Sequence, residues 1–254
     1  MNNEKRIAIV TGGYHGIGKG IAEVLAGDDV VVIVTTRKKQ ESVANVPEEI
    51  GKNIWGIAMN VLDQKSIENG FQICKDFFGI PNILVNNAGV YVRGSTLEMQ
   101  REEWNLIMDT NLSAVFWVSQ YFSKQLISLK KGGNIVNISS NAAFNYYPLQ
   151  IAYNVSKESL NSLTRQMAKE LKECKIRVNA ICPGSVYTQM LINIAQNMAD
   201  EQNIAYDAAI NSLKLGNIGR FVSSEEIGHI VKFLISDSAE IISGQVITAD
   251  AGLT

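Results

Sequence analysis

The sequence predicts an α/β protein built on one doubly wound parallel sheet. Short runs rich in Val and Ile recur along the 254 residues, and most of them are apolar at consecutive positions. That pattern is typical of strands covered on both faces. Longer stretches with helical spacing separate the runs, and this alternation favours a parallel sheet between two helical layers. A chain of this length can bury a sizeable core in a single domain covering residues 1–254.

The predicted strands and helices follow one another in chain order. Seven apolar runs give a seven-stranded sheet: RIAIVTGG, VVVIVTT, NIWGIAMNV, PNILVNNAG, GGNIVNISS, KIRVNAICPG and GQVITADAG. Five intervening stretches have the apolar spacing of helices: 18–27, 66–79, 101–131, 152–174 and 223–236. No linker, low-complexity segment or internal repeat separates these elements, so we expect all seven strands to share one sheet.

Composition and charge exclude several classes of protein. The chain is 46% apolar and 19% charged, as in soluble globular proteins, and its net charge of −2 gives no basic field for nucleic acid or an anionic membrane. The apolar run after MNNEKR is too short for a signal-peptide core or a membrane span. We therefore expect a cytoplasmic protein with no nucleic-acid or membrane partner.

The three cysteines do not predict a disulfide framework. Cys74, Cys174 and Cys182 are odd in number and show no CxxC spacing, which fits a reducing compartment. A nucleophilic cysteine is disfavoured because the two histidines offer no evident Cys/His pair, and buried free cysteine is common.

A glycine-rich turn follows the first predicted strand. The stretch VTGGYHGIGKG places Gly12, Gly16 and Gly18 in a TGxxxGxG spacing directly before a predicted helix. Glycines let the backbone turn tightly and approach a pyrophosphate, and the free N–H groups of a helix start point at the anion. A glycine-rich turn without a ligand is the alternative, but its position between a strand and a helix favours a phosphate-binding loop.

Several motifs in a fixed order resemble the short-chain dehydrogenase/reductase family. The TGxxxGIG turn is followed by NNAG at 86–89, Tyr153-x-x-x-Lys157, RVNAICPG at 177–184 and GQVITADAG at 244–252. Each motif is weak alone, but together they cover essentially the whole chain. Within the family, the sequence is most similar to NADPH-dependent 3-oxoacyl-[acyl-carrier-protein] reductases and their relatives. The resemblance implies a Rossmann fold and the reduction of a carbonyl to an alcohol.

The resemblance also implies four catalytic residues. Tyr153 would be the general acid/base and Lys157 its partner, while Ser140, 13 residues before Tyr153, would hydrogen-bond the substrate oxygen. Asn111 would kink its helix and hold a water in a proton relay to the lysine. Tyr153 and Lys157 share one face of a helix, and an ammonium within ~4–6 Å is expected to lower the phenol pKa by roughly 1–3 units. The alternatives are that Tyr153 and Lys157 form an ordinary surface pair, that Ser139 takes the place of Ser140, and that Asn111 faces solvent.

The end of the second predicted strand favours NADP(H) over NAD(H). NAD-specific relatives carry an acidic residue there, whereas this chain has Thr36 followed by Arg37 and Lys38. A guanidinium fork and a hydroxyl suit the 2′-phosphate of NADP. His15 stands where NADP-preferring relatives often carry a basic residue. A solvated charge run is the alternative for Arg37 and Lys38, but it does not explain the missing acid.

Further cofactor contacts follow from the same resemblance. Asn60 and Val61 would meet the adenine, NNAG would line the adenosine ribose, and PGSVYT would wrap the nicotinamide carboxamide and so orient the ring. Lys157 would also hold the nicotinamide ribose. The expected cofactor-binding residues are Gly12, His15, Gly16, Ile17, Gly18, Thr36, Arg37, Asn60, Val61, Asn87, Ala88, Gly89, Tyr153, Lys157, Pro183, Gly184, Val186 and Thr188.

Residues 189–215 are expected to form a flexible lid over the substrate. The segment is apolar and weakly charged, which suits a non-polar chain, while a helix packed on the domain or on a neighbouring subunit is an equal alternative. Phe144, Tyr146 and Tyr147 stand shortly before Tyr153 and favour a ketone or an acyl thioester over a free sugar.

The sequence leaves the substrate and the assembly open. A small-molecule carbonyl, foremost a 3-oxoacyl thioester either free or on a carrier protein, is expected. An alcohol, hydroxysteroid or secondary-metabolite dehydrogenase and a non-catalytic cofactor-binding protein are the alternatives. Lys130, Lys131, Lys172 and Lys175 are candidates for meeting an acidic carrier, although a solvated surface explains them better. Relatives are mostly homotetramers, so the resemblance implies a homotetramer.

Overall fold

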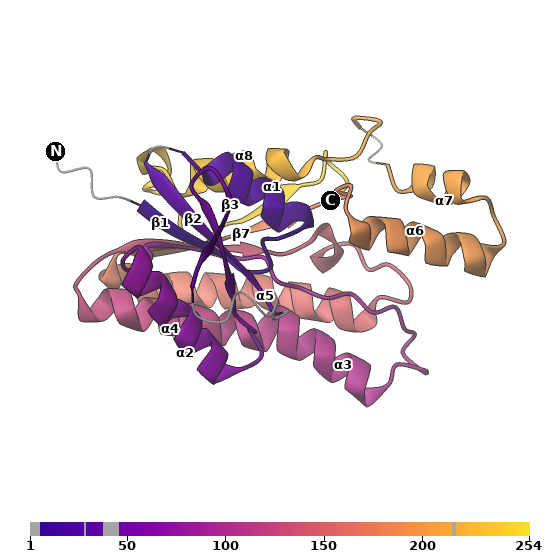
Figure 1. Cartoon of the computed structure of the whole chain (residues 1–254). Helices are drawn as coiled ribbons and strands as arrows, with labels where there is room; N and C mark the ends of the chain where they lie inside the picture. Colours follow the sequence, from indigo (N-terminus) through magenta and orange to yellow (C-terminus); the bar gives the residue numbers. More distant parts are fainter. Residues whose placement is uncertain (1–5, 28, 38–45, 215–216) are drawn as a thin grey trace.

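A twisted sheet forms the centre of the computed structural model, which describes residues 6–27, 29–37, 46–214 and 217–254 (Figure 1). Within these residues the sheet has eight strands in the order β3-β4-β2-β1-β5-β6-β7-β8, and all neighbours except β3 and β4 pair in parallel. The strands are β1 Arg6–Val10, β2 Val30–Thr36, β3 Glu48–Gly51, β4 Ile54–Ala58, β5 Ile83–Asn86, β6 Gly133–Ile138, β7 Ile176–Pro183 and β8 Val246–Ala249.

Helices cover both faces of the sheet, as the doubly wound prediction requires. In Figure 1, α1 and α8 lie on one face and α2, α4 and α5 on the other. Each layer buries its own apolar cluster, and β1 and β2 contribute alternate side chains to both clusters. The helices are α1 Gly16–Leu25, α2 Gln64–Phe77, α3 Arg101–Met108, α4 Ala114–Ser128, α5 Ile151–Leu171, α6 Gln189–Gln202, α7 Tyr206–Ser212 and α8 Ser224–Leu234.

The seven predicted parallel strands are confirmed, and β3 is an additional strand that the sequence did not reveal. Its segment EEIG is short, and Glu48, Glu49 and Ile50 are all exposed. An antiparallel edge strand of this kind buries little, so it lacks the consecutive apolar residues that identified the other strands. It extends the sheet beyond β4 with a register shift between Glu49 and Gly51.

The long predicted helix over 101–131 is interrupted in its middle. Residues Asp109–Ser113 form a π-helical turn that joins α3 to α4. π-Turns within helices are rare and occur frequently at functional sites. Asn111 lies at the centre of this turn and is fully buried, so a solvent-facing asparagine is excluded.

The segment after β7 folds into two helices, α6 and α7, that project beyond the end of the sheet (Figure 1). They enclose a small apolar cluster of their own, separate from the two clusters against the sheet. The predicted lid over 189–215 therefore corresponds to a helical hairpin, except that its last residue, Leu215, lies outside the described residues.

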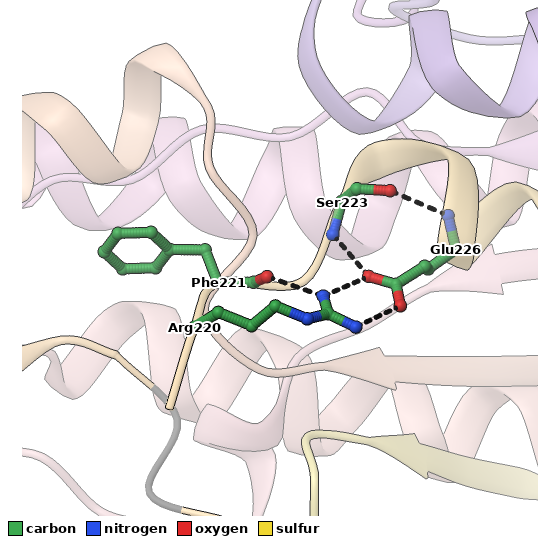
Figure 2. A network of polar contacts seen from close by, with 4 residues as sticks. All are labelled: Arg220, Phe221, Ser223 and Glu226. Carbon is green, nitrogen blue, oxygen red and sulfur yellow. Dashed lines mark hydrogen bonds and ion pairs between the residues drawn. The ribbon is translucent and has the colours of Figure 1, made fainter. Parts of the chain in front are cut away.

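A polar network anchors the start of α8 beside this hairpin. Figure 2 shows the two terminal nitrogens of Arg220, Nη1 and Nη2, donating to the Glu226 carboxylate, at 2.8 Å each. Ser223 and Glu226 form a reciprocal capping box at the helix start. The Arg220 guanidinium also donates to the Phe221 carbonyl at 2.9 Å, which fixes the backbone that leads into α8. Among the described residues, no helix is both long and apolar enough to cross a membrane.

Candidate active site

A cavity of about 400 Å³ opens at the carboxyl ends of the central strands. It lies where β1 separates β2 on one side from β5 on the other, the topological switch point at which doubly wound sheets bind ligands. Fourteen predicted site residues line it: Gly12, His15, Gly16, Ile17, Thr36, Arg37, Asn60, Val61, Asn87, Ala88, Gly89, Tyr153, Lys157 and Thr188.

The glycine-rich turn is shaped to receive an anion. Gly12 and Gly16 adopt positive φ angles of 64° and 54°, a backbone region that residues other than glycine rarely occupy. Helix α1 begins at Gly16, its cap residue His15 makes no side-chain capping bond, and its first turn carries no acidic residue. The start of a helix therefore faces the cavity without an internal anion, so the site fits a pyrophosphate.

Gly18 supports this turn from beneath instead of lining the cavity. A Cβ on Gly18 would lie 2.4 Å from Nδ2 of Asn87. That amide donates to the carbonyls of Thr11 and Gly12, at 2.9 and 3.1 Å, and so ties the loop after β5 to the phosphate-binding turn. The glycine spacing is thus required for this close approach.

The far end of the cavity carries no carboxylate at the predicted specificity position. Thr36 ends β2 half-buried, and Arg37 follows it exposed to solvent. Lys38, the third residue of the predicted 2′-phosphate site, lies outside the described residues. Asn60 uses its side-chain oxygen to accept from the Leu62 N–H at 3.2 Å, which orients its amide at the cavity wall.

Tyr153 and Lys157 stand one turn apart on α5 and both line the cavity. The Lys157 ammonium is buried, donates to the Ile138 carbonyl at 2.9 Å and lies 5.7 Å from the centre of the Tyr153 ring. A surface Tyr–Lys pair is therefore excluded.

Burial moves the pKa values of these two groups in opposite directions. It raises the pKa of Tyr153 to about 12, although the neighbouring Ser140 hydroxyl lowers it, and it lowers the pKa of Lys157 to about 8. The expected lowering of the phenol pKa by Lys157 is not seen here: burial is the largest influence on the pKa of Tyr153, and Lys157 is not among the groups that shift it. At neutral pH the phenol keeps its proton and the ammonium keeps most of its charge.

The two serines at the end of β6 have different partners. Ser140, the predicted residue, accepts from the Ala142 N–H at 3.1 Å and lies at the Tyr153 hydroxyl. Ser139 is buried, lines the cavity, and donates to the Lys157 carbonyl at 3.2 Å within the fold. The structure thus brings Ser140 to the phenol, while Ser139 stabilises the packing of β6 against α5.

Asn111 joins the π-turn to the loop after β5. Its amide donates to the Val90 carbonyl at 2.9 Å, and its oxygen accepts from the Val90 N–H at the same distance. The amide is also 3.2 Å from the Ser156 hydroxyl on α5. A Cβ on Gly89 would lie 3.3 Å from the Asn111 oxygen and 3.8 Å from the Lys157 ammonium, so both groups face the same point.

The predicted nicotinamide segment reaches the cavity only at its end. Thr188 lines the cavity and caps α6, whereas Pro183, Gly184 and Val186 do not line it. The Gly184 N–H donates to the Ala249 carbonyl at 3.1 Å, and Val186 pairs with Val222 in an isolated bridge. These residues hold the chain at the position from which α6 starts.

Several residues near the phenol were not predicted. Tyr91 packs edge-on against Tyr153 with ring centres 5.3 Å apart, and Met190 of α6 reaches the cavity. Cys182 is buried among Ser139, Asn161 and Lys157, and burial raises its pKa, so a nucleophilic cysteine has no support. Of these three residues, Cys182 alone belongs to a sequence motif, RVNAICPG, that could have placed it near the site. Tyr91 and Met190 belong to no motif.

This arrangement can bind an elongated anionic cofactor and donate a proton at one end of it. The turn around Gly12 and Gly16 suits a pyrophosphate, and Tyr153, Ser140 and Lys157 gather a neutral phenol, a hydroxyl and an ammonium. Phenol and hydroxyl are both able to hydrogen-bond a carbonyl oxygen.

Comparison with known proteins agrees with the geometry. Residues 12–254 match a family model described as Enoyl-(Acyl carrier protein) reductase. The chain is 34% identical over 253 residues to 3-oxoacyl-[acyl-carrier-protein] reductase of Escherichia coli, covering 100% of this chain and 99% of that protein.

Two solved structures are similar over nearly the whole chain. One is a variant of actinorhodin polyketide ketoreductase with NADPH, at a TM-score of 0.90 and 28% identity over 99% of this chain and 98% of that one. The other is L-sorbose reductase of Gluconobacter frateurii with NADPH and L-sorbose, at a TM-score of 0.87 and 25% identity over 100% and 98% of the two chains. The protein therefore belongs to the short-chain dehydrogenase/reductase family.

Proposed function

We propose that the protein is an NADPH-dependent reductase that converts a ketone, foremost a 3-oxoacyl thioester, into an alcohol. The observation that carries the proposal is the position of the neutral Tyr153 phenol and the Lys157 ammonium at one end of a cavity whose other parts suit an anionic dinucleotide. A non-catalytic cofactor-binding protein has no need of this combination.

The bound nicotinamide supplies the hydride, and the residues of this chain supply orientation and the proton. Ser140 and Tyr153 hydrogen-bond the carbonyl oxygen. Tyr153 gives its proton to that oxygen as negative charge develops on it, and its raised pKa keeps the proton available at neutral pH. Lys157 stabilises the resulting phenolate and uses its remaining N–H donors to hold the nicotinamide ribose.

Asn111 supports this proton transfer from behind Lys157. Its oxygen faces the same point as the ammonium, beside Gly89, where it holds a water of the relay. Its three contacts to Val90 and Ser156 keep that oxygen in place, so the π-turn is the device that positions it.

NADP(H) is the preferred cofactor in this proposal. Thr36 and Arg37 offer a hydroxyl and a guanidinium where an acidic residue would repel a 2′-phosphate. His15, exposed beside them, adds a ring nitrogen. Two of the similar solved structures contain NADPH. Among the other predicted contacts that line the cavity, Asn60 and Val61 meet the adenine, the NNAG loop meets the ribose and Thr188 meets the carboxamide in this proposal.

The substrate class rests on the relatives and on the aromatic residues around the site. The Escherichia coli relative is a 3-oxoacyl-[acyl-carrier-protein] reductase and one structural neighbour is a polyketide ketoreductase. Tyr91 lies against Tyr153, and Phe144, Tyr146 and Tyr147 are partly exposed just before α5, which suits an acyl chain.

Cofactor oxidation with a panel of ketones tests this proposal. Acetoacetyl thioester, a polyketide-like cyclic ketone and L-sorbose are each offered with NADPH and with NADH. The expected result is rapid oxidation of NADPH, at least tenfold faster than NADH, with the thioester as the best substrate. Turnover with NADH alone would contradict the proposal that Thr36 and Arg37 select NADPH. A protein that binds NADPH but reduces no ketone would contradict the proposed reductase activity.

A further inference from the structure

The hairpin of α6 and α7 is joined to the rest of the chain at two separate places. Its own cluster of Leu191, Ala195 and Ile210 is distinct from the two clusters against the sheet. A segment with a small separate core opens at lower free energy than the elements that share the main core. The contacts at its two ends therefore decide how it sits over the active site.

The near end of the hairpin is firmly anchored. Thr188 caps α6, and Phe221 packs both into the hairpin cluster and against the Tyr187 ring, with ring centres 5.4 Å apart. The network in Figure 2 holds Phe221 from the other side, because Arg220 binds both the Phe221 carbonyl and the Glu226 carboxylate. These contacts fix the near end of the hairpin, so any opening motion of α6 would pivot about this end.

An ion pair links the far end of α6 to the loop after β5. Glu201, in the last turn of the helix, lies 2.8 Å from the guanidinium of Arg93 in the loop after β5. Tyr91, two residues before Arg93, is the ring that packs on Tyr153. Burial raises the pKa of Tyr91, Arg93 lowers it and Glu201 raises it, so these groups form one neighbourhood.

Helix α6 spans the distance between these two ends. Its 14 residues correspond to about 21 Å at the usual rise of 1.5 Å per residue. Its cap Thr188 and its second residue Met190 line the cavity, and Glu201 near its other end pairs with Arg93. The Arg93–Glu201 pair therefore links α6 to the loop whose Tyr91 packs on Tyr153.

The ion pair is suited to opening and closing. The Glu201 side chain is 48% exposed and that of Arg93 is 21% exposed, so salt and water weaken the pair. The Nε of Arg93 is buried and has no hydrogen-bond partner in the described part of the chain, which makes the closed arrangement less favourable for the guanidinium than a fully paired one.

We propose that Arg93 and Glu201 form a latch that closes α6 over Tyr91 and Tyr153, with Arg93 as a positioning residue for substrate. The latch itself follows from the ion pair and the separate core of the hairpin. Its effect on substrate binding rests on the function proposed above, so the first test does not require turnover.

Hydrogen–deuterium exchange of the α6 amides in the whole protein tests the latch. Glu201→Gln is compared with Asp200→Asn, which removes the neighbouring carboxylate; that carboxylate accepts a hydrogen bond from Gln196 within the same helix. Both changes remove negative charge from a helix C-terminus and would slightly stabilise an isolated helix. The latch predicts the opposite for Glu201→Gln, an increase in α6 exchange of about two- to fivefold, and no increase for Asp200→Asn.

Two further measurements keep the test sharp. Raising the salt from 0.1 M to 0.5 M KCl shortens the screening length from about 10 Å to roughly 4 Å, and this should raise α6 exchange in the unmodified protein but not in Glu201→Gln. A charge-swapped double variant, Arg93→Glu with Glu201→Arg, can form the ion pair in reverse. Its hydrogen–deuterium exchange rate in α6 should return toward that of the unmodified protein. Equal exchange in the unmodified protein, Glu201→Gln and Asp200→Asn, or no salt effect, would overturn the latch.

Kinetics with the accepted ketone then test the positioning role. Loss of the latch should raise KM for the ketone about two- to fivefold, while kcat and the Kd of NADPH stay nearly unchanged. If no ketone is reduced at all, the proposed function fails while the exchange result still decides the latch. An unchanged KM together with increased exchange would overturn the positioning role of Arg93.

Discussion

At the scale of single residues, burial sets the chemistry of Tyr153 and Lys157. The pKa of the phenol is raised to about 12 and that of the ammonium is lowered to about 8 by the same loss of hydration. The upper limit of the reductase's pH range is therefore expected from the lysine, since the phenol stays neutral until far higher pH.

The pH dependence of turnover follows from these values. As pH rises through about 8, Lys157 loses its charge and can no longer stabilise the phenolate, so reduction should slow while Tyr153 is still protonated. The measurement is kcat/KM at low concentrations of NADPH and ketone, which reports the free enzyme. A fall with an apparent pKa near 8 is expected, and a rate that stays level to pH 10 would contradict the assignment to Lys157.

Sequence motifs predicted the residues of this site because the chemistry needs particular types at particular spacings. Gly12, Gly16, Tyr153 and Lys157 all line the cavity. No local pattern predicts the role of Arg93, because its ion pair joins residues 108 positions apart in the chain. The sequence does not reveal the direction in which the pKa of Tyr153 shifts, because that direction depends on burial, which only the fold determines.

At the scale of elements, the packing of α1 on α8 depends on a glycine. A Cβ on Gly20 would lie 2.4 Å from the Cβ of Ser224 and 2.6 Å from its backbone carbonyl carbon. The two helices must approach this closely for α8 to reach the apolar cluster that it shares with α1 and the sheet. A side chain there would force the helices apart.

Gly20→Ala should therefore destabilise the protein. Overpacking of this kind costs about 1–3 kcal/mol, which for a chain of this size corresponds to a Tm lower by roughly 2–10 °C. Gly27→Ala is the matched control, because its Cβ would meet no atom closer than 3.4 Å, and its Tm should hardly change. Thermal unfolding followed by circular dichroism decides, and equal Tm values for the two variants would refute the packing argument.

The elements that the sequence predicted well are those that bury continuous apolar runs. Strand β2, VVVIVTT, is buried along almost its whole length and was unmistakable, whereas β3 buries almost nothing and was missed. The sequence does not decide whether residues 189–202 form a flexible lid or a packed helix, because the same apolar residues suit both. The π-turn at 109–113 depends on contacts to Val90 and Ser156 that lie far away in the sequence.

At the scale of the whole molecule, exposed apolar side chains on α4 and α5 favour assembly. Trp117 and Ile127 on α4 are 48% and 43% exposed, and Val155 on α5 is 37% exposed. Because exposed apolar residues can mark interaction surfaces, we expect these helices to meet a second copy in the homotetramer that the family resemblance implies.

Light scattering of the purified protein tests this assembly. The expected mass is about four times the 27.9 kDa of one chain, and Trp117→Lys should shift it to smaller species. Leu97→Lys is the control, since Leu97 is 95% exposed but belongs to the loop before α3 and to neither α4 nor α5. A single species of one chain mass for the unmodified protein would rule out the tetramer.

The central claim is that Tyr153 donates the proton in an NADPH-dependent ketone reduction. The most direct measurement is turnover of Tyr153→Phe with the best ketone of the panel, together with the Kd of NADPH by fluorescence. The account predicts a loss of at least 100-fold in kcat with a Kd within about threefold of the original, because the variant keeps the ring and removes only the proton donor. Turnover close to that of the unmodified protein would contradict the account.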